Sequence, residues 1–280
     1  MQINNHYVKQ LLELALAEDI GIGDVTSDVI IPKDRVSTGI IISKDTGLVA
    51  GLEVVELILG MVDSQLTLTP ILSDGDKIEH GIKIGNIYGP ARSMLKVERL
   101  VLNFLQRLSG IATLTSKYVQ TVADYPVKII DTRKTTPGWR ILEKYAVRVG
   151  GGYNHRFGLY DAVLIKDNHI ALAGSITEAI EMARSQIPHT MKIEVETKSI
   201  QQVSEALDAK PDIIMLDNMT IDEMKESVKL IDGRAPIEAS GNVRLETVKK
   251  IAETGVNLIS IGALTHSAPA LDISIDVIID

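Results

Sequence analysis

The spacing of apolar residues divides the chain into two parts with different patterns. In the first part, helical spacing alternates with short extended runs that are bounded by Gly, Asp and Pro residues. The expected helices are residues 6–18, 52–60 and 93–109, and the expected strands are residues 38–43, 66–70 and 77–89. We therefore expect residues 1–112 to form an N-terminal α/β sandwich with an antiparallel sheet. On the third helix, Arg99 lies nearly opposite the apolar stripe.

The second part alternates short apolar runs with amphipathic segments, which predicts parallel strands joined by right-handed helical crossovers. The runs are residues 127–131, 162–166, 191–195, 212–216, 236–240 and 257–261, and the helices are residues 139–149, 175–186, 199–208, 220–230 and 244–253. A complete eight-unit barrel takes ~250 residues. Because residues 113–269 are too few for that, we expect an incomplete parallel α/β barrel of about six strands. The closing segment 270–280 is extended, and we expect it to return to the N-terminal sheet.

Composition limits the function. The chain has 280 residues, a formal net charge of −8 and no cysteine. The absence of cysteine excludes disulfides, cysteine-zinc sites and thiol catalysis. An acidic chain lacks the broad basic face that nonspecific nucleic-acid binding needs, so no nucleic-acid partner is expected. No apolar run has the ~20 residues of a membrane span, and the N-terminus lacks the order of a signal peptide. We expect a cytoplasmic protein.

Positive charge is nevertheless concentrated in one segment. From Lys128 to His169 there are eight Lys and Arg residues against four Asp and Glu residues. Three of these cations follow helical spacing, which is typical of a solvated helix face: Arg140, Lys144 and Arg148. The others lie at strand ends or beside the glycines at 150–152, where carboxyl ends of barrel strands form a site. We expect these to line a cationic mouth: Arg133, Lys134, His155, Arg156 and Lys166.

Acidic residues end the next strands. Glu196 and Asp217 could hold Mg²⁺ through waters or ligand oxygens, or bind sugar hydroxyls, and the alternative is a salt bridge to a neighbouring lysine. Glu194 shares a strand face with Lys192, so an ion pair between them is expected instead of a functional role.

Glycine turns follow the last two strands, in "EASGNV" and "SIGALTHS". Exposed backbone N–H groups at such turns bind phosphate, and the last strands of phosphate-binding barrels commonly supply that site. The residues therefore predict two anionic ligands. One is rich in carboxylates and meets the cationic mouth, and the other is phosphorylated, chelates a metal and lies between the acids and the glycine turns.

Motifs along the whole chain resemble the quinolinate phosphoribosyltransferase family, also called nicotinate-nucleotide pyrophosphorylase (carboxylating). They are "ED.G.GD.TS" near the start, "ERLVLNFLQRLSGIAT", "DTRKTTPGWRILEKYAVRVGGGYNHR", "LIKDNH", "EVE", "LDN", "SGN" and "GALTHS", in family order. Two positions depart from the family's pattern: Trp139 stands where leucine is expected, and Leu100 where threonine is common. Neither position carries a charged role.

The resemblance implies that quinolinate and phosphoribosyl pyrophosphate give nicotinate mononucleotide, pyrophosphate and CO₂ with Mg²⁺, in de novo NAD synthesis. It implies a homodimer, or a multiple of dimers, in which Arg99 enters the site of a second subunit. Lys134, Glu196 and Asp217 are the implied catalytic residues, with the two acids serving ribose and metal. The implied substrate-binding residues are Arg99, Thr132, Arg133, Lys134, His155, Arg156, Lys166, Glu196, Asp217, Ser240, Gly241, Asn242, Gly262, Ala263 and Leu264.

Three other functions compete with this one. A paralogue from molybdate-transport gene clusters shares the scaffold, but the complete basic set counts against it. A barrel lyase acting on a phosphosugar through a Lys–Asp array would use "IKD", yet it leaves Arg133 and Arg156 unexplained. A non-catalytic metabolite sensor would not need both Glu196 and Asp217.

Overall fold

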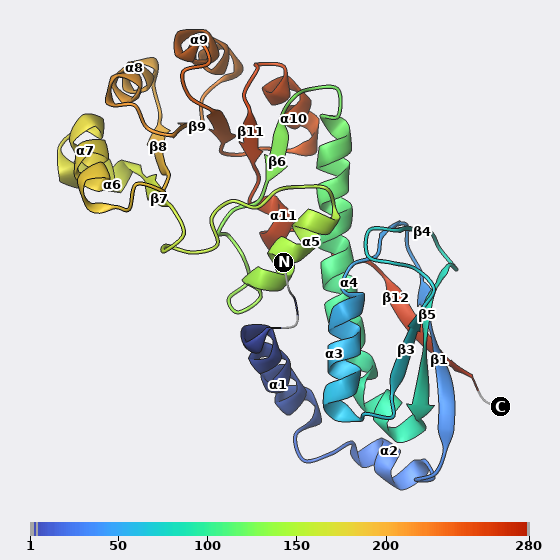
Figure 1. Cartoon of the computed structure of the whole chain (residues 1–280). Coiled ribbons are helices and arrows are strands. Elements are labelled where there is room, and N and C mark those ends of the chain that lie inside the picture. Colours follow the sequence, from blue (N-terminus) through green and yellow to red (C-terminus); the bar gives the residue numbers. More distant parts are fainter. Residues whose placement is uncertain (1–2, 4, 279–280) are drawn as a thin grey trace. The chain divides into compact units, whose positions relative to one another are not determined.

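The computed structural model describes residue 3 and residues 5–278. Contacts group the chain into two compact units, each described by itself below (Figure 1). The N-terminal unit comprises Met1–Thr115, Thr135–Gly151 and Leu264–Asp280, and the barrel unit comprises Ser116–Lys134 and Gly152–Ala263. Over the described part of the chain, no helix combines the length and the apolar character needed to cross a membrane.

The N-terminal unit contains a four-stranded sheet in the order β12-β1-β5-β3. The strands are β1 (Val36–Ser43), β3 (Thr67–Pro70), β5 (Lys83–Pro90) and β12 (Ile273–Ile278), with a separate pair β2 (Gly47–Leu48) and β4 (Lys77–Ile78). The expected return of the C-terminal segment is seen in the antiparallel pairing of β12 with β1, where Ile275 lies opposite Ile41. Its last two residues, 279 and 280, lie outside the described residues.

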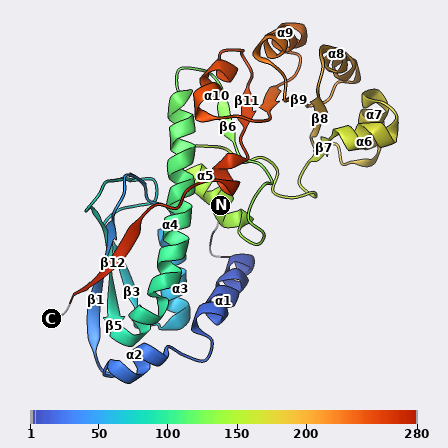
Figure 2. The same cartoon turned by 180° about the vertical axis from the view of Figure 1, so that it is seen from behind.

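The first segment of this unit contributes, in whole or in part, the helices α1 (His6–Ile20), α2 (Val25–Ile30), α3 (Leu52–Val62) and α4 (Ala91–Thr121). Figures 1 and 2 show α3 and α4 on the same side of the four-stranded sheet. The apolar stripe predicted for residues 93–109 is buried, with Val97, Val101 and Leu105 fully enclosed. The sequence pattern missed α2, which begins at the capping residue Asp24.

Helix α4 continues well beyond residue 109, where the predicted helix ends. The residues from 109 to 115, "SGIATLT", are mostly small or polar. In the structure these residues make packing and hydrogen-bond contacts instead. Ser109 Oγ accepts from the Ala50 N–H at 3.0 Å, and Thr113 Oγ1 accepts from the Leu48 N–H at 2.9 Å. Because these hydroxyls have tertiary partners, they do not end the helix.

The barrel unit contains a parallel sheet in the order β6-β11-β10-β9-β8-β7. The strands are β6 (Lys128–Ile130), β7 (Val163–Ile165), β8 (Ile193–Thr197), β9 (Ile213–Asp217), β10 (Ile237–Ser240) and β11 (Leu258–Ser260). The first strand pairs with the last, while β6 and β7 stand at the two ends of the order. The expected sandwich and incomplete six-stranded barrel are confirmed.

Helices follow the strands of this unit along one face of the sheet (Figures 1 and 2). They are α6 (Asp167–Ala173), α7 (Ile176–Gln186), α8 (Ile200–Ala209), α9 (Ile221–Ile231) and α10 (Leu245–Ala252), and only α6 was not predicted. Three begin at capping hydroxyls, those of Ser175, Ser199 and Thr220. This arrangement directs the carboxyl ends of all six strands toward one edge, where polar side chains gather.

Residues 135–151, with helix α5 (Arg140–Val149), group with the N-terminal unit, whereas the sequence pattern included them in 113–269. A buried ion pair explains this grouping: Arg107 Nη2 lies 2.8 Å from Glu143 Oε1, and Glu143 also accepts from Thr136. Trp139 stacks on Phe104 with a centroid separation of 4.3 Å. The prediction that Lys144 lies on a solvated face is wrong, because α5 packs within this unit and the Lys144 side chain is completely buried.

Candidate active site

The carboxyl ends of the parallel strands surround a cavity of about 670 Å³, a volume typical of small-molecule sites. All residues that line it belong to the barrel unit. They are Thr132, Arg133, Lys134, His155, Arg156, Leu164, Lys166, Asp167, Glu196, Lys198, Met215, Asp217, Asn218, Glu238, Ser240, Gly241, Asn242 and Ser260.

Most of the residues selected from the sequence line this cavity. Those that do are Thr132, Arg133, Lys134, His155, Arg156, Lys166, Glu196, Asp217, Ser240, Gly241 and Asn242. Four do not: Arg99, Gly262, Ala263 and Leu264. Arg99 is exposed on α4, as its helical position predicts, and Leu264 is fully buried in the short helix α11 (Ala263–His266).

The cationic wall depends on a loop held by Asp131. This buried carboxylate accepts from Asn154 Nδ2 at 2.6 Å and from the His155 N–H at 2.8 Å. The loop thereby presents Arg156, whose Nη1 donates to the Ala162 carbonyl. Burial lowers the pKa of the Arg156 guanidinium, and the nearby charge of Arg133 lowers it further. Two guanidinium groups brought together out of water favour an anion between them.

His155 has a protein partner at each ring nitrogen. Nδ1 accepts from the Arg156 N–H at 2.8 Å, so the ring proton is assigned to Nε2, which lies 3.0 Å from Glu194 Oε2 and 3.7 Å from Glu238 Oε2. His155 therefore orients the main chain of Arg156. The expected Lys192–Glu194 pair is wrong: Lys192 lies at the amino end of β8 and pairs with Asp212, while Glu194 points to His155.

Glu238 is a site residue that the sequence analysis did not identify. It is 1% exposed on β10, within a cluster whose other members are His155 and Glu194. Burial raises its pKa well above the usual range, and the negative charge of Glu194 raises it further. The only sequence signal was a glutamate inside an otherwise apolar strand, "PIEAS".

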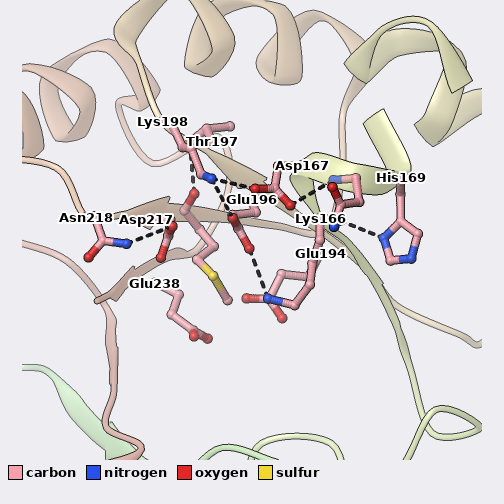
Figure 3. A network of polar contacts seen from close by, with 12 residues as sticks. Lys166, Asp167, His169, Glu194, Glu196, Thr197, Lys198, Asp217, Asn218 and Glu238 are labelled. Atoms are coloured by element: carbon pink, nitrogen blue, oxygen red, sulfur yellow. Dashed lines mark hydrogen bonds and ion pairs between the residues drawn. The ribbon is translucent and has the colours of Figure 1, made fainter. Parts of the chain in front are cut away.

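The opposite wall combines acids with lysines (Figure 3). Lys166 Nζ lies 3.0 Å from Glu196 Oε2, which realises the salt bridge considered as the alternative role for Glu196. Lys198, which the sequence analysis did not identify, has its Nζ 2.6 Å from Asp167 Oδ2 and 3.7 Å from Glu196 Oε1. This hydrogen bond raises the pKa of Lys198 and lowers that of Asp167. Its sequence signal is position, two residues after Glu196.

The loops after β9 and β10 hold each other in shape. The Asn218 N–H donates to the Ser240 carbonyl, and Asn242 Nδ2 donates to Asn218 Oδ1. Both asparagines have positive φ, at 55° and 50°. Gly241 lies between these groups with φ +101°, and a Cβ there would overlap Asn218 Oδ1. Only glycine therefore allows this close approach.

The residues proposed for a metal can be judged by their donors. Glu196 and Asp217 offer carboxylate oxygens on the cavity wall, which suit Mg²⁺ together with water and phosphate oxygens. Among the described residues, the cluster of three ligand-type side chains is a different one, His155, Glu194 and Glu238. There the proton on His155 Nε2 faces the carboxylates, so the cluster is an internal hydrogen-bonding group. Glu196 and Asp217 fit the ion by chemistry.

An open parallel α/β barrel with cations, acids and glycine turns at its strand ends defines a barrel enzyme for phosphorylated substrates. Comparison with family models gives a specific result. The model described as "Quinolinate phosphoribosyl transferase, N-terminal domain" matches residues 24–109, and the one described as "Quinolinate phosphoribosyl transferase, C-terminal domain" matches residues 111–276. The chain belongs to the quinolinate phosphoribosyltransferase family.

Individual relatives agree over the full length. A protein of Bacillus subtilis named "Probable nicotinate-nucleotide pyrophosphorylase [carboxylating]" is 46% identical over 98% of this chain and 95% of its own. A mitochondrial quinolinate phosphoribosyltransferase [decarboxylating] of Nicotiana tabacum is 45% identical over 96% of this chain and 82% of its own. The crystal structure of NadC from Streptococcus pyogenes has a TM-score of 0.96 at 41% identity, covering 100% of both chains.

Proposed function

We propose that the protein transfers the phosphoribosyl group of phosphoribosyl pyrophosphate to quinolinate and decarboxylates the product, giving nicotinate mononucleotide, pyrophosphate and CO₂ in NAD biosynthesis. The observation that carries this is Arg156, whose Nε is buried and lacks a hydrogen-bond partner within the described residues. A buried cationic donor needs an acceptor, and a substrate carboxylate supplies one. Family membership and relatives named for this reaction support the same activity.

The cationic residues have distinct roles in this reaction. Quinolinate carries two carboxylates, which Arg133 and Arg156 bind with their planar forks while Lys134 and Lys166 add compact charge. His155 acts through Arg156, because its Nδ1 accepts a hydrogen bond from the Arg156 main-chain N–H. The same cations serve later, when the bond from the ring to the C2 carboxylate breaks. Its electron pair stays on C2, where the adjacent positively charged ring nitrogen stabilises it, CO₂ leaves, and C2 then takes up a proton.

Ribose lies between the acids in this proposal. The quinolinate nitrogen attacks ribose C1 as the bond from C1 to pyrophosphate breaks, and positive charge develops on the sugar. Glu196 and Asp217 stabilise this charge and bind the ribose hydroxyls. The same two carboxylates would hold Mg²⁺ through waters or ligand oxygens, and the ion would supply positive charge to the leaving pyrophosphate. Lys134 adds positive charge at the leaving group.

The 5′-phosphate is assigned to the glycine turns. Ser240, Gly241 and Asn242 line the cavity, and the neighbouring turn of Gly262, Ala263 and Leu264 would supply further backbone N–H groups. Thr132 lines the same cavity. We further propose a cytoplasmic homodimer, or a multiple of dimers, in which Arg99 completes the site of the partner subunit. Neither nucleic acid nor a membrane is a proposed partner.

Substrate choice tests the proposed function. Nicotinate lacks the second carboxylate, so it would leave buried cations unpaired, at a cost of ~1–3 kcal/mol for each group. We expect kcat/KM for quinolinate to exceed that for nicotinate by at least about tenfold, with pyrophosphate and CO₂ released in equal amounts. Both products are followed in one assay with Mg²⁺. Comparable values for the two acids, or CO₂ release without pyrophosphate as in a barrel lyase, would contradict the proposal.

A further inference from the structure

Lys198 stands immediately after β8, on the cavity wall that also carries Glu196 and Asp217. Figure 3 shows its side chain directed toward Asp167 and Glu196. The Nζ atom is 2.6 Å from Asp167 Oδ2 and 3.7 Å from Glu196 Oε1. The second distance is too long for a hydrogen bond, so one of the three ammonium donors has a close protein acceptor here.

The ion pair of Lys198 is more open than that of Lys166, whose side chain is 47% exposed but whose partner Glu196 is 7% exposed. The Lys198 side chain is 46% exposed and that of its partner Asp167 is 54% exposed. An ion pair this open contributes little to stability, and a competing anion readily replaces one partner. The Lys198 ammonium is thus both near the reacting region and able to exchange Asp167 for a ligand oxygen.

The order of strands indicates which part of a ligand reaches Lys198. Ser240 ends β10, Asp217 ends β9 and Lys198 follows β8, and these three strands are neighbours in the sheet. With strands ~4.8 Å apart, the two outer positions are about 10 Å apart, with Asp217 between them. A ribose at Asp217 whose 5′-phosphate meets the β10 turn directs its C1 substituent toward β8. In phosphoribosyl pyrophosphate that substituent is the pyrophosphate.

We propose that Lys198 is a further substrate-binding residue that contacts the pyrophosphate group, and that Asp167 holds its side chain at the cavity when no phosphate is bound. This inference rests on the proposed function. In the complex, the Lys198 ammonium exchanges its hydrogen bond to the Asp167 carboxylate for one to a phosphate oxygen. It therefore keeps a charge-assisted hydrogen bond. Lys198 then acts on the leaving group, while Arg133 and Arg156 act on quinolinate.

Lys192 provides a matched control at the other end of the same strand. Its ammonium also pairs with an aspartate, Asp212 at 3.1 Å, and its side chain is 69% exposed. Lys192 does not line the cavity. Lys198→Met and Lys192→Met therefore remove the same charge and a comparable surface ion pair, and they differ only in access to the site.

Calorimetric titration with inorganic pyrophosphate in the presence of Mg²⁺ measures the contact directly. We expect Lys198→Met to weaken pyrophosphate binding and to raise KM for phosphoribosyl pyrophosphate by about tenfold, the scale of one hydrogen bond between charged groups. KM for quinolinate should be unchanged. Lys198→Arg should recover most of the affinity, and Lys192→Met should match the unmodified protein.

Two results overturn the inference. One is unchanged pyrophosphate binding in Lys198→Met that melts at the same temperature as the unmodified protein. The other is a raised KM for quinolinate with normal pyrophosphate binding, which would assign Lys198 to the acid's side of the cavity. Failure of the proposed function is distinguishable, because an unmodified protein that does not convert quinolinate still reports on Lys198 through the pyrophosphate titration.

Discussion

At the scale of single residues, the carboxyl groups of Glu194 and Glu238 create an unusual environment behind the cationic wall. If both are counted as ionised, each has a buried Oε1 that finds no hydrogen-bond partner among the described residues. A proton on Glu238 resolves this, because a protonated carboxyl donates where a carboxylate only accepts. Burial and the charge of Glu194 raise the pKa of Glu238 in this sense. Glu238 therefore acts as a neutral positioning group for His155.

Replacing Glu238 by glutamine tests its protonation state. A raised pKa in the folded protein favours folding below the unfolded value of ~4.3, and this contribution is lost as pH rises through the folded pKa. Glutamine stays neutral and keeps a similar shape. We expect Glu238→Gln to melt at a higher temperature relative to the unmodified protein at about pH 8 than at about pH 5. A difference that does not depend on pH would contradict a protonated Glu238.

At the scale of elements, helix α4 makes a backbone contact that requires glycine. A Cβ on Gly110 would overlap the carbonyl oxygen of Pro269, in the segment that leads to β12. Close by, Arg107 Nη1 donates to the Ala268 carbonyl at 3.0 Å, and the Leu271 N–H donates to the Gln106 carbonyl. The return of the chain to the N-terminal sheet thus depends on close packing along α4.

Two alanine substitutions separate helix propensity from this contact. Gly110→Ala should lower the free energy of unfolding by about 1–3 kcal/mol, because backbone atoms must move. Gly60→Ala is the control: Gly60 lies on α3, where a Cβ would have no neighbouring atom within 4 Å, so alanine should stabilise by ~0.4–1 kcal/mol. Urea denaturation measures both. If the two variants change stability in the same direction, the contact with Pro269 does not constrain the helix.

For the assembled protein, the position of Arg99 bears on whether one subunit supplies a side chain to the cavity of another. It is exposed on α4, and it is not among the residues that line the cavity of the barrel unit. In a dimer with two-fold symmetry, each subunit can offer Arg99 to the cavity of the other. The side chain then acts without belonging to its own subunit's site.

Complementation between inactive variants tests this arrangement. Arg99→Ala and Lys134→Ala should each be nearly inactive as homodimers. In a mixed dimer one site collects both defects and the other collects neither, and random reassortment makes about half of the dimers mixed. Activity should therefore return to about a quarter of that of the unmodified protein. If mixed dimers form and no activity returns, Arg99 does not act in the partner's site.

Local patterns determined much of this protein. Apolar periodicity located all six barrel strands and the helices after them, except the short helices α6 and α11, because a strand or helix must bury one face and consecutive residues show this requirement. The carboxyl ends of those strands then identified most of the cavity's lining, since parallel strands present the same end at one edge. The order of the motifs along the chain also indicates the family.

Which distant residues meet depends on the folded structure. Glu194 pairs with His155 and not with Lys192, and Lys198 lies beside Asp167; both contacts join segments that are far apart in the chain. The burial of Lys144 is set by how its helix packs. The length of α4 likewise depended on partners such as Ala50 and Leu48, which accommodate its hydroxyls. A local pattern states that a side chain is buried or polar, but its partner follows from strand order, register and helix packing, which are properties of the whole folded unit.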